Sequence, residues 1–198
     1  MTNTNTATLT VENLKEIAGK GPLYLGLKKE EALIYDRTEN ISITAPIGSG
    51  GTNLANVILI QVAQRFKSLD SLVFVAEKTT DFIQFIENGA QEVTEPEDAV
   101  KKLKEMCYER PDKEQILYIE NVDYFLDKTN HSILPFLLEL ITRRDVQVII
   151  NNRSHSKLQN IFETTLDATE NRGEFIKKDD SKHRPYKVQV PLVAMDKA

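Results

Sequence analysis

A glycine-rich segment, residues 45–52, has the spacing of a phosphate-binding loop. In the pattern G-x-x-x-x-G-K-[ST], backbone N–H groups surround the phosphates, the lysine reaches the β- and γ-phosphates, and the Ser/Thr hydroxyl binds Mg²⁺. In this register Ala45 stands in place of the first glycine, Gly50 is retained, Gly51 replaces the lysine and Thr52 supplies the hydroxyl. The spacing is therefore kept, whereas the mobile positive charge is missing.

The same turn has a second way to hold an anion. Amide donors of a glycine-rich turn and the N-terminal end of the following helix bind anions without any side chain. Two interpretations stay open, a turn that retains nucleotide binding and a turn that only joins a strand to a helix. We favour the second, because Gly51 cannot follow the phosphates through a transition state as a lysine does.

A second candidate lies at the end of the apolar strand QILYIEN, residues 115–121. Glu120 falls where an acid would bind Mg²⁺, and Asn121 falls where a carboxylate would activate the attacking water. An amide cannot act as a general base. Asp123 is a possible substitute, although we interpret it as a helix or turn cap. With two catalytic groups replaced, the sequence predicts a domain whose role does not require hydrolysis.

A third candidate is VIINNRS, residues 148–154. In hexameric motor domains such a strand end carries a polar sensor of the γ-phosphate, and Asn151, Asn152 and Arg153 are chemically suitable. Polar residues are also typical of any strand-to-loop transition. Arg143 and Arg144 are possible arginine fingers, but arginines in a last helical turn also complement the helix dipole, which is the interpretation we favour.

These three segments define a vestigial nucleotide site. Its expected members are Gly48, Ser49, Gly50, Gly51, Thr52, Asn53, Glu120, Asn121 and Asn152. We expect no catalytic residue and no metal site. ATP and magnesium are expected as ligands only if the altered site retains binding, and no other cofactor is expected. The domain is thus predicted to be a pseudo-ATPase rather than an enzyme.

Composition limits the other possibilities. The 198 residues carry a formal charge of −5, which argues against nucleic acid as a partner. Cys107 is the single cysteine, so we expect a reducing compartment and a small apolar side chain on a helix. No apolar run reaches the length of a membrane span, and no signal peptide is visible. Any membrane association would have to come from another segment or chain.

The remaining pattern alternates strands and helices. We expect a tail and short helix over residues 1–20, and one α/β domain over residues 21–198. Beyond the strand, turn and helix of residues 41–67, strands are expected over 21–28, 31–37, 71–77, 115–120, 146–151, 173–177 and 186–193. Helices are expected over 10–20, 80–88, 95–109, 132–144 and 157–162. The first and last pairs of strands are hairpins, so the prediction is a RecA-like P-loop NTPase fold: a mainly parallel sheet flanked by helices, with small antiparallel additions.

The order of these motifs resembles FtsK/SpoIIIE-type ATPase domains. The resemblance covers residues 21–192 and rests on IYDRTENISITAP, the altered loop, ILYIENVD, VIINNRS and ENRGEFI followed by KVQVPL. VIINNRS replaces the family segment that usually reads ATQRP, with Arg153 kept. Within the group, the chain is most similar to the C-terminal degenerate ATPase domain of EssC-like (YukB-like) coupling proteins of type VIIb secretion systems. Departures at Ala45, Gly51 and Asn121 distinguish it from active members.

The resemblance implies a cytoplasmic domain of a membrane-anchored protein. Its implied role is substrate recognition or regulation of the secretion motor. The implied partners are small helical secreted proteins or their complexes and neighbouring ATPase domains of the same chain, with a hexamer possible for the full-length protein. A groove beside the altered site would bind apolar anchors at helical spacing. Leu134, Phe136, Leu137 and Leu140 are expected in the core rather than in that groove. A residual ATP-driven translocase motor and a purely structural end-cap remain as alternatives.

Overall fold

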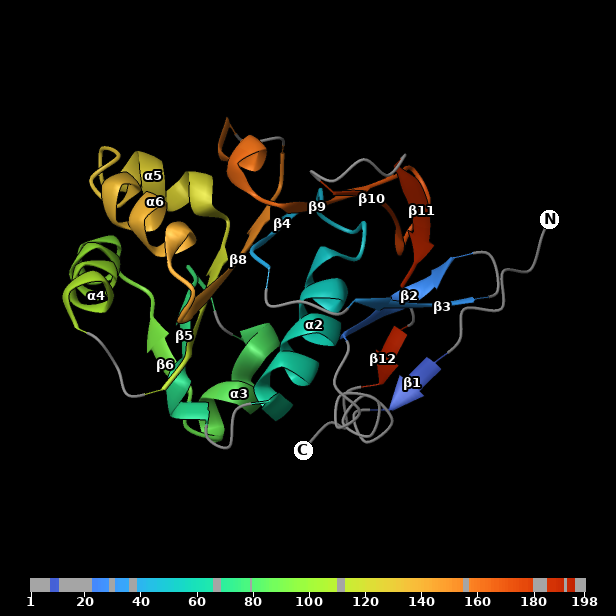
Figure 1. Cartoon of the computed structure of the whole chain (residues 1–198), viewed down its shortest axis with the longest axis horizontal. Coiled ribbons are helices and arrows are strands. Elements are labelled where there is room, and N and C mark those ends of the chain that lie inside the picture. Colours follow the sequence, from blue (N-terminus) through green and yellow to red (C-terminus); the bar gives the residue numbers. More distant parts are fainter. Residues whose placement is uncertain are drawn as a thin grey trace.

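The core of the protein is one large sheet with helices on both faces (Figure 1). The computed structural model describes residues 8–10, 23–28, 31–35, 39–65, 69–78, 80–109, 113–154, 157–179, 185–190 and 192–194. In this part of the chain, ten strands form the sheet in the order β3-β2-β11-β10-β9-β4-β8-β7-β5-β6. The strands are β2 (Leu23–Lys28), β3 (Glu31–Tyr35), β4 (Ile41–Thr44), β5 (Leu72–Val75), β6 (Gln91–Val93), β7 (Gln115–Glu120), β8 (Val146–Asn152), β9 (Thr164–Ala168), β10 (Glu174–Asp179) and β11 (Tyr186–Gln189).

Two further strands, β1 (Thr8–Thr10) and β12 (Leu192–Ala194), pair in parallel as a separate small sheet. The helices are α2 (Gly51–Arg65), α3 (Ile83–Glu87), α4 (Pro96–Tyr108), α5 (Val122–Lys128) and α6 (Leu134–Thr142). Within the described residues, short 3₁₀ turns are η1 (Leu69–Ser71), η2 (Thr80–Phe82) and η3 (Lys157–Ile161).

The sheet divides into a parallel and an antiparallel part. The strands β9, β4, β8, β7, β5 and β6 are parallel neighbours. Beyond β9, the strands β10, β11, β2 and β3 pair antiparallel. The predicted mainly parallel α/β P-loop NTPase-like fold with antiparallel additions is therefore confirmed.

The central strands are apolar throughout because both faces of the sheet are covered. Alternate side chains of β5, such as Phe74 and Val75, enter different core clusters. The cluster containing Phe74 includes residues of α2 and α3, and the cluster containing Val75 includes residues of α4, α5 and α6. Figure 1 shows these two groups of helices on opposite sides of the sheet. This two-sided burial explains why continuous apolar runs identified the strands.

Several elements differ from the sequence prediction. The strands β6 and β9 and helix α5 were not expected, because each is short and lacks a long apolar run. The segment 157–162 forms a 3₁₀ turn, and 80–88 divides into η2 and α3. Thr8–Thr10, expected to belong to the N-terminal tail and the first residue of a helix, form β1. The rest of the helix predicted over 10–20 lies outside the described residues.

The α6 residues that were assigned to the core do lie there. Leu137 and Leu140 are fully buried, and Leu134 and Phe136 pack against the same cluster. All four side chains thus contribute to the core, and full burial keeps Leu137 and Leu140 out of any surface groove.

An aromatic cluster joins β5 and β7 to the segment formed by η2 and α3. The ring of Phe74 lies 5.3 Å from Phe82, 5.5 Å from Phe85 and 5.5 Å from Tyr118. We predict that Phe74→Ala lowers the free energy of unfolding by about 3–5 kcal/mol, because it removes a fully buried ring and leaves a cavity.

Denaturant unfolding measures this loss. Ile83→Ala is the control, because Ile83 is 51% exposed on the same helical segment and its truncation is expected to cost less than about 1 kcal/mol. Equal losses in the two variants would contradict the assignment of Phe74 to the core.

Candidate functional site

A cleft of about 400 Å³ lies where the parallel strands end and α2 begins. Ligands bind at this edge in sheets of this kind, and the volume suits a small molecule. Its lining comes from the glycine-rich loop and α2, from η2, from the ends of β7 and β8, and from the turn between β9 and β10. The lining residues are Ala45, Pro46, Ile47, Gly48, Gly50, Gly51, Thr52, Asn53, Asp81, Glu120, Asn151, Arg153 and Arg172.

The structure brings six of the nine expected site residues to this cleft. They are Gly48, Gly50, Gly51, Thr52, Asn53 and Glu120. The other three, Ser49, Asn121 and Asn152, are not among the lining residues, and each has a position that explains this.

Ser49 holds the loop together rather than facing the cleft. Its backbone N–H and its hydroxyl both donate to the carbonyl oxygen of Pro46, at 3.0 and 2.7 Å. Its own carbonyl accepts a hydrogen bond from the N–H of Gly173 at 2.8 Å. The loop is thereby fixed to the turn between β9 and β10.

Asn121 connects β7 to α5. It has left-handed backbone angles, φ 56° and ψ 60°, a conformation in which asparagine is enriched among residues other than glycine. Its N–H donates to the carbonyl of Asn151 at 2.6 Å. A glutamate here would have to adopt the same strained conformation. Asp123, the possible substitute base, lies in the first turn of α5 and does not line the cleft.

Strand alternation separates Asn151 from Asn152. Successive side chains of a strand point to opposite faces of the sheet. Asn151 lines the cleft, whereas Asn152 does not and is only 2% exposed. Asn151 is therefore the amide of VIINNRS that faces the cleft.

The first turn of α2 passes very close to the end of β4. A Cβ atom added at Gly51 would lie 2.4 Å from the Cβ of Ala45. Carbon atoms that are not bonded to each other pack at about 3.5–4.0 Å, so these two positions cannot both carry a side chain without a shift of the backbone. The two departures from the phosphate-binding pattern are thus coupled: a lysine at Gly51 has no room while Ala45 is present.

Glu120 lies on the cleft floor in a polar cluster. The Tyr118 hydroxyl donates to Oε2 of Glu120, and Nδ2 of Asn151 donates to both carboxylate oxygens at 3.2 and 3.1 Å. Burial raises the pKa of Glu120 above its usual value, and nearby Asp81 raises it further. The hydrogen bonds from Tyr118 and Asn151 and the charge of Arg153 act in the opposite direction without cancelling the shift. Burial also raises the pKa of Tyr118.

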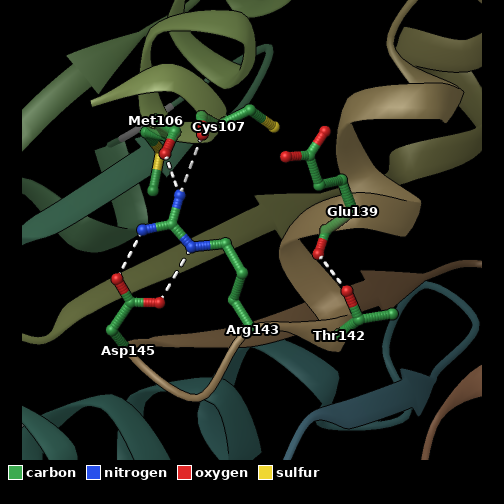
Figure 2. A network of polar contacts seen from close by, with 6 residues as sticks. All are labelled: Met106, Cys107, Glu139, Thr142, Arg143 and Asp145. Atoms are coloured by element: carbon green, nitrogen blue, oxygen red, sulfur yellow. Dashed lines mark hydrogen bonds and ion pairs between the residues drawn. The ribbon is translucent and has the colours of Figure 1, made fainter. Parts of the chain in front are cut away.

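Arg143 does not reach the cleft. Its Nη1 donates to the carbonyls of Met106 and Cys107, the latter at 3.3 Å, and its Nε donates to Oδ1 of Asp145 at 2.8 Å (Figure 2). An ion pair with Asp145 completes the arrangement. Arg143 thus binds the C-terminal end of α4, which fits a structural role for this arginine rather than that of an arginine finger.

Cys107 belongs to the same structural region. It is half-buried and packs against the core, and its Sγ donates to the carbonyl of Phe136 at 3.4 Å. Burial and nearby Glu139 raise its pKa to about 11, so its thiol is protonated at neutral pH. Among the described residues, no group of three or more His, Cys, Asp or Glu side chains is placed to hold a metal ion.

Two cleft residues, Asp81 and Arg172, were not recognised from the sequence. Asp81 was assigned to a helix with no site role, and the turn that carries Arg172 was hidden because β9 was not predicted. The sequence signal nearest to Arg172 is the NRG triplet, whose Gly173 has a positive φ of 77° as expected for a tight turn.

We predict that Gly51→Ala destabilises the protein, because the new methyl group overlaps the Cβ of Ala45. Overpacking of this kind costs about 1–3 kcal/mol. Adding Ala45→Gly should recover most of that loss, which gives a favourable coupling of similar size in a double-mutant cycle. Denaturant unfolding of the four proteins measures it, and strictly additive effects would show that the two positions do not compete for space.

Glu120 should make stability depend on pH. The pKa of Glu120 is raised in the folded state, so protonation of its carboxyl group stabilises the folded protein. This stabilisation is complete below the pKa that Glu120 has in the unfolded chain, and it is lost as pH rises through the pKa of the folded protein. We therefore expect Glu120→Gln to gain stability relative to wild type as pH rises from about 4 to 7. Denaturant unfolding across this range tests it, with Glu87→Gln, at an exposed position of α3, as the control. The same pH dependence in wild type and Glu120→Gln would contradict the prediction.

In the described part of the chain, no helix has the length and apolar character needed to cross a membrane. The sequence matches no protein-family model and no curated protein. Similarity appears at the level of structure, and it supports the fold rather than a shared activity.

One similar structure is that of ATPases 2 and 3 of EccC from Thermomonospora curvata in complex with a signal sequence peptide. It has a TM-score of 0.71 at 11% sequence identity, covering 88% of this chain and 41% of that one. The pCW3 conjugation coupling protein TcpA with ATPγS has a TM-score of 0.71 at 14% identity, covering 87% and 66%. ATPases 2 and 3 of EssC from Geobacillus thermodenitrificans give 0.63 at 12%, covering 88% and 42%. The chain thus has the fold of coupling-protein ATPase domains and spans less than half of the EccC and EssC chains.

Proposed function

We propose that this chain is a non-hydrolysing ATPase-like domain of a type VII secretion coupling protein, and that it recognises secreted substrates or regulates the secretion motor. The observation that carries the proposal is the contact between the end of β4 and the first turn of α2. With Ala45 filling the space beside Gly51, the loop cannot supply the lysine that phosphoryl transfer uses. Asn121 adds a second obstacle, because an amide cannot remove a proton from water.

The comparison with EccC supports a role in substrate recognition. That relative is described in complex with a signal sequence peptide, and its fold is similar to this one over 88% of the present chain. We propose that this domain likewise binds small helical secreted proteins or their complexes. An amphipathic helix would present apolar side chains at i, i+3 and i+4 to a groove on the domain.

The surface beside the cleft offers one clear anchor point. Ile47 is 84% exposed and lines the cleft, so its apolar side chain is available for contact with a partner. We propose that Ile47 contacts an apolar side chain of the substrate helix. Leu137 and Leu140 of α6 are excluded from this role because they are fully buried.

The same proposal includes the setting of the domain. We propose that it belongs to the cytoplasmic part of a membrane-anchored protein, where it contacts neighbouring ATPase domains of the same chain, and that the full-length protein forms a hexamer. The formal charge of −5 disfavours nucleic acid as its partner.

A residual motor is the second candidate function. It is favoured by Thr52 and Glu120, which both line the cleft. In active P-loop NTPases a loop hydroxyl and an acidic side chain at a strand end bind Mg²⁺. A motor requires turnover, so phosphate release separates it from the proposed role. A purely structural end-cap would show neither turnover nor binding of a secreted substrate.

The proposal predicts that the purified domain releases no phosphate from Mg-ATP above background and retains a purified small helical secreted substrate in a pull-down. Ile47→Asp should weaken that capture by about tenfold, which corresponds to about 1.4 kcal/mol. The matched control is Leu138→Asp, since Leu138 is 40% exposed on α6, which packs on the sheet face opposite α2.

Each alternative has its own outcome. Measurable phosphate release would favour the motor, and capture of no substrate in the absence of turnover would favour the end-cap. We also expect Gly51→Lys combined with Asn121→Glu to remain without efficient hydrolysis, because Ala45 still occupies the space beside residue 51. Robust turnover by that double variant would contradict the proposal.

A further inference from the structure

We propose that Asn88 is a site of spontaneous deamidation, and that the turn which ends α3 controls how fast it reacts. Asn88 is the only asparagine in the sequence that is followed by a glycine. Glycine has no Cβ atom, so its amide nitrogen can approach the preceding side chain closely. Neither residue lines the cleft, and the inference does not depend on the proposed function.

The reaction requires only these two residues and water. The backbone nitrogen of Gly89 attacks Cγ of Asn88, a bond forms between them, and the bond from Cγ to Nδ2 breaks. The proton lost from the Gly89 nitrogen completes the side-chain nitrogen as ammonia, which leaves a five-membered succinimide ring. Water then opens the ring. Addition of water at Cγ gives aspartate, and addition at the main-chain carbonyl carbon gives isoaspartate, in which the main chain runs through Cβ and Cγ.

The reacting groups lie at the surface of the protein. Asn88 and Gly89 are both exposed. A Cβ atom added at Gly89 would meet no described heavy atom within 4 Å apart from its chain neighbours, so water and hydroxide have access to the turn. Gly89 has a positive φ of 103°, a conformation that favours glycine. The turn therefore requires the residue type that makes Asn88 reactive.

The hydrogen bonds of the turn oppose the reaction in the folded protein. The N–H of Gly89 donates to the carbonyl of Ile86, and the N–H of Ala90 donates to the carbonyl of Phe85, each at 3.0 Å. Together these two bonds form a Schellman motif, which ends many helices. The attacking nitrogen is thus occupied as a hydrogen-bond donor while the motif is closed.

The leaving group is held by the same helix. Nδ2 of Asn88 donates to the carbonyl of Gln84 at 2.6 Å. Opening of the turn frees this nitrogen and the Gly89 nitrogen together. Helix α3 has only five residues, and short surface elements of this kind open locally at a lower free energy than the core. Asn88 should therefore react slowly in the folded protein, at a rate set by the fraction of time that the turn is open.

Either product weakens the turn. Aspartate has no donor for the carbonyl of Gln84, and its negative charge lies at the C-terminal end of a helix, where the helix dipole disfavours it. Isoaspartate also lengthens the main chain just before Gly89. The hydrogen bonds made by the N–H groups of Gly89 and Ala90 are then displaced, so we expect isoaspartate to be the more disruptive product.

The turn joins the core to the edge of the sheet. Phe85 is 4% exposed and Ala90 is 7% exposed, and both belong to the core cluster that contains Phe74. The edge strand β6 begins at Gln91, which pairs with Val73 of β5. A longer main chain before Ala90 changes the entry into β6. Deamidation is therefore expected to loosen α3 and β6 before the central strands.

Peptide mass spectrometry of wild type during incubation at mildly alkaline pH tests the inference, with labelling by an isoaspartyl methyltransferase to detect isoaspartate. Asn88 should convert in the native protein, and at least about tenfold faster in denaturant, which corresponds to a local opening free energy of about 1.4 kcal/mol or more. Asn88→Gln is the control for the assignment, because its longer side chain would have to close a larger ring. No conversion is expected at position 88 in that variant.

Two variants of α3 test control by the turn. Phe85→Ala removes a buried ring that lies 5.5 Å from Phe74, and it should speed conversion in the native protein by about tenfold. Ile83→Ala is the matched control, because Ile83 is 51% exposed, and it should leave the rate unchanged. If Phe85→Ala does not fold, wild type is measured in denaturant below its unfolding transition, where conversion should rise with denaturant concentration.

The effect of the products is read from hydrogen exchange of the amides in residues 90–93. Exchange there should be faster in the isoaspartate form than in Asn88→Asp, which carries the aspartate product without the longer main chain, and slowest in unmodified wild type. Three outcomes would overturn the inference: no conversion of Asn88 in the native protein, equal rates in native and denatured protein, or the same exchange in all three forms.

Discussion

The close approach of α2 to the end of β4 is the constraint on which the candidate site depends. The helix begins at Gly51, whose missing side chain leaves just enough room for the methyl group of Ala45. Such a contact can be relieved from either side, by a glycine at position 45 or by a glycine at position 51. Phosphate-binding loops with the usual pattern have the first arrangement and can carry the lysine, whereas this chain has the second. The lack of room between positions 45 and 51 therefore accounts for both Ala45 and Gly51, the two departures from the usual loop pattern.

A second contact links this loop to the antiparallel part of the sheet. Gly50 lies beside Gly173, and a Cβ on Gly50 would approach the Gly173 backbone to 3.4 Å. The hydrogen bonds from Gly173 to Ser49 and from Val190 to Gly173 continue this connection toward β11. The antiparallel strands are thus part of the site's support, and they deliver Arg172 to a cleft that the parallel strands form.

The sequence predicted the parts of the fold that depend on strong local patterns. The strand over residues 115–120 was predicted with its observed bounds, because an apolar run bounded by polar residues is typical of a strand buried on both faces. The short strands β6 and β9 were missed because pairing partners, rather than their own residues, hold them in the sheet. In the same way, six of the nine expected site residues line the cleft, because the spacing of the glycine-rich loop and the end of the strand over 115–120 identified their positions. Asp81 and Arg172 could not be predicted, because only the tertiary fold brings their segments to the loop.

A crystal structure of the Gly51→Ala variant would test the central claim most directly, because it reports the distance between the Cβ atoms of residues 45 and 51. The account predicts that Ala45 and the first turn of α2 move apart by about 1 Å or more, since the 2.4 Å separation is too short for two methyl groups. An unchanged loop that accommodates the new methyl group would contradict it, because a side chain at position 51 would then have room beside Ala45.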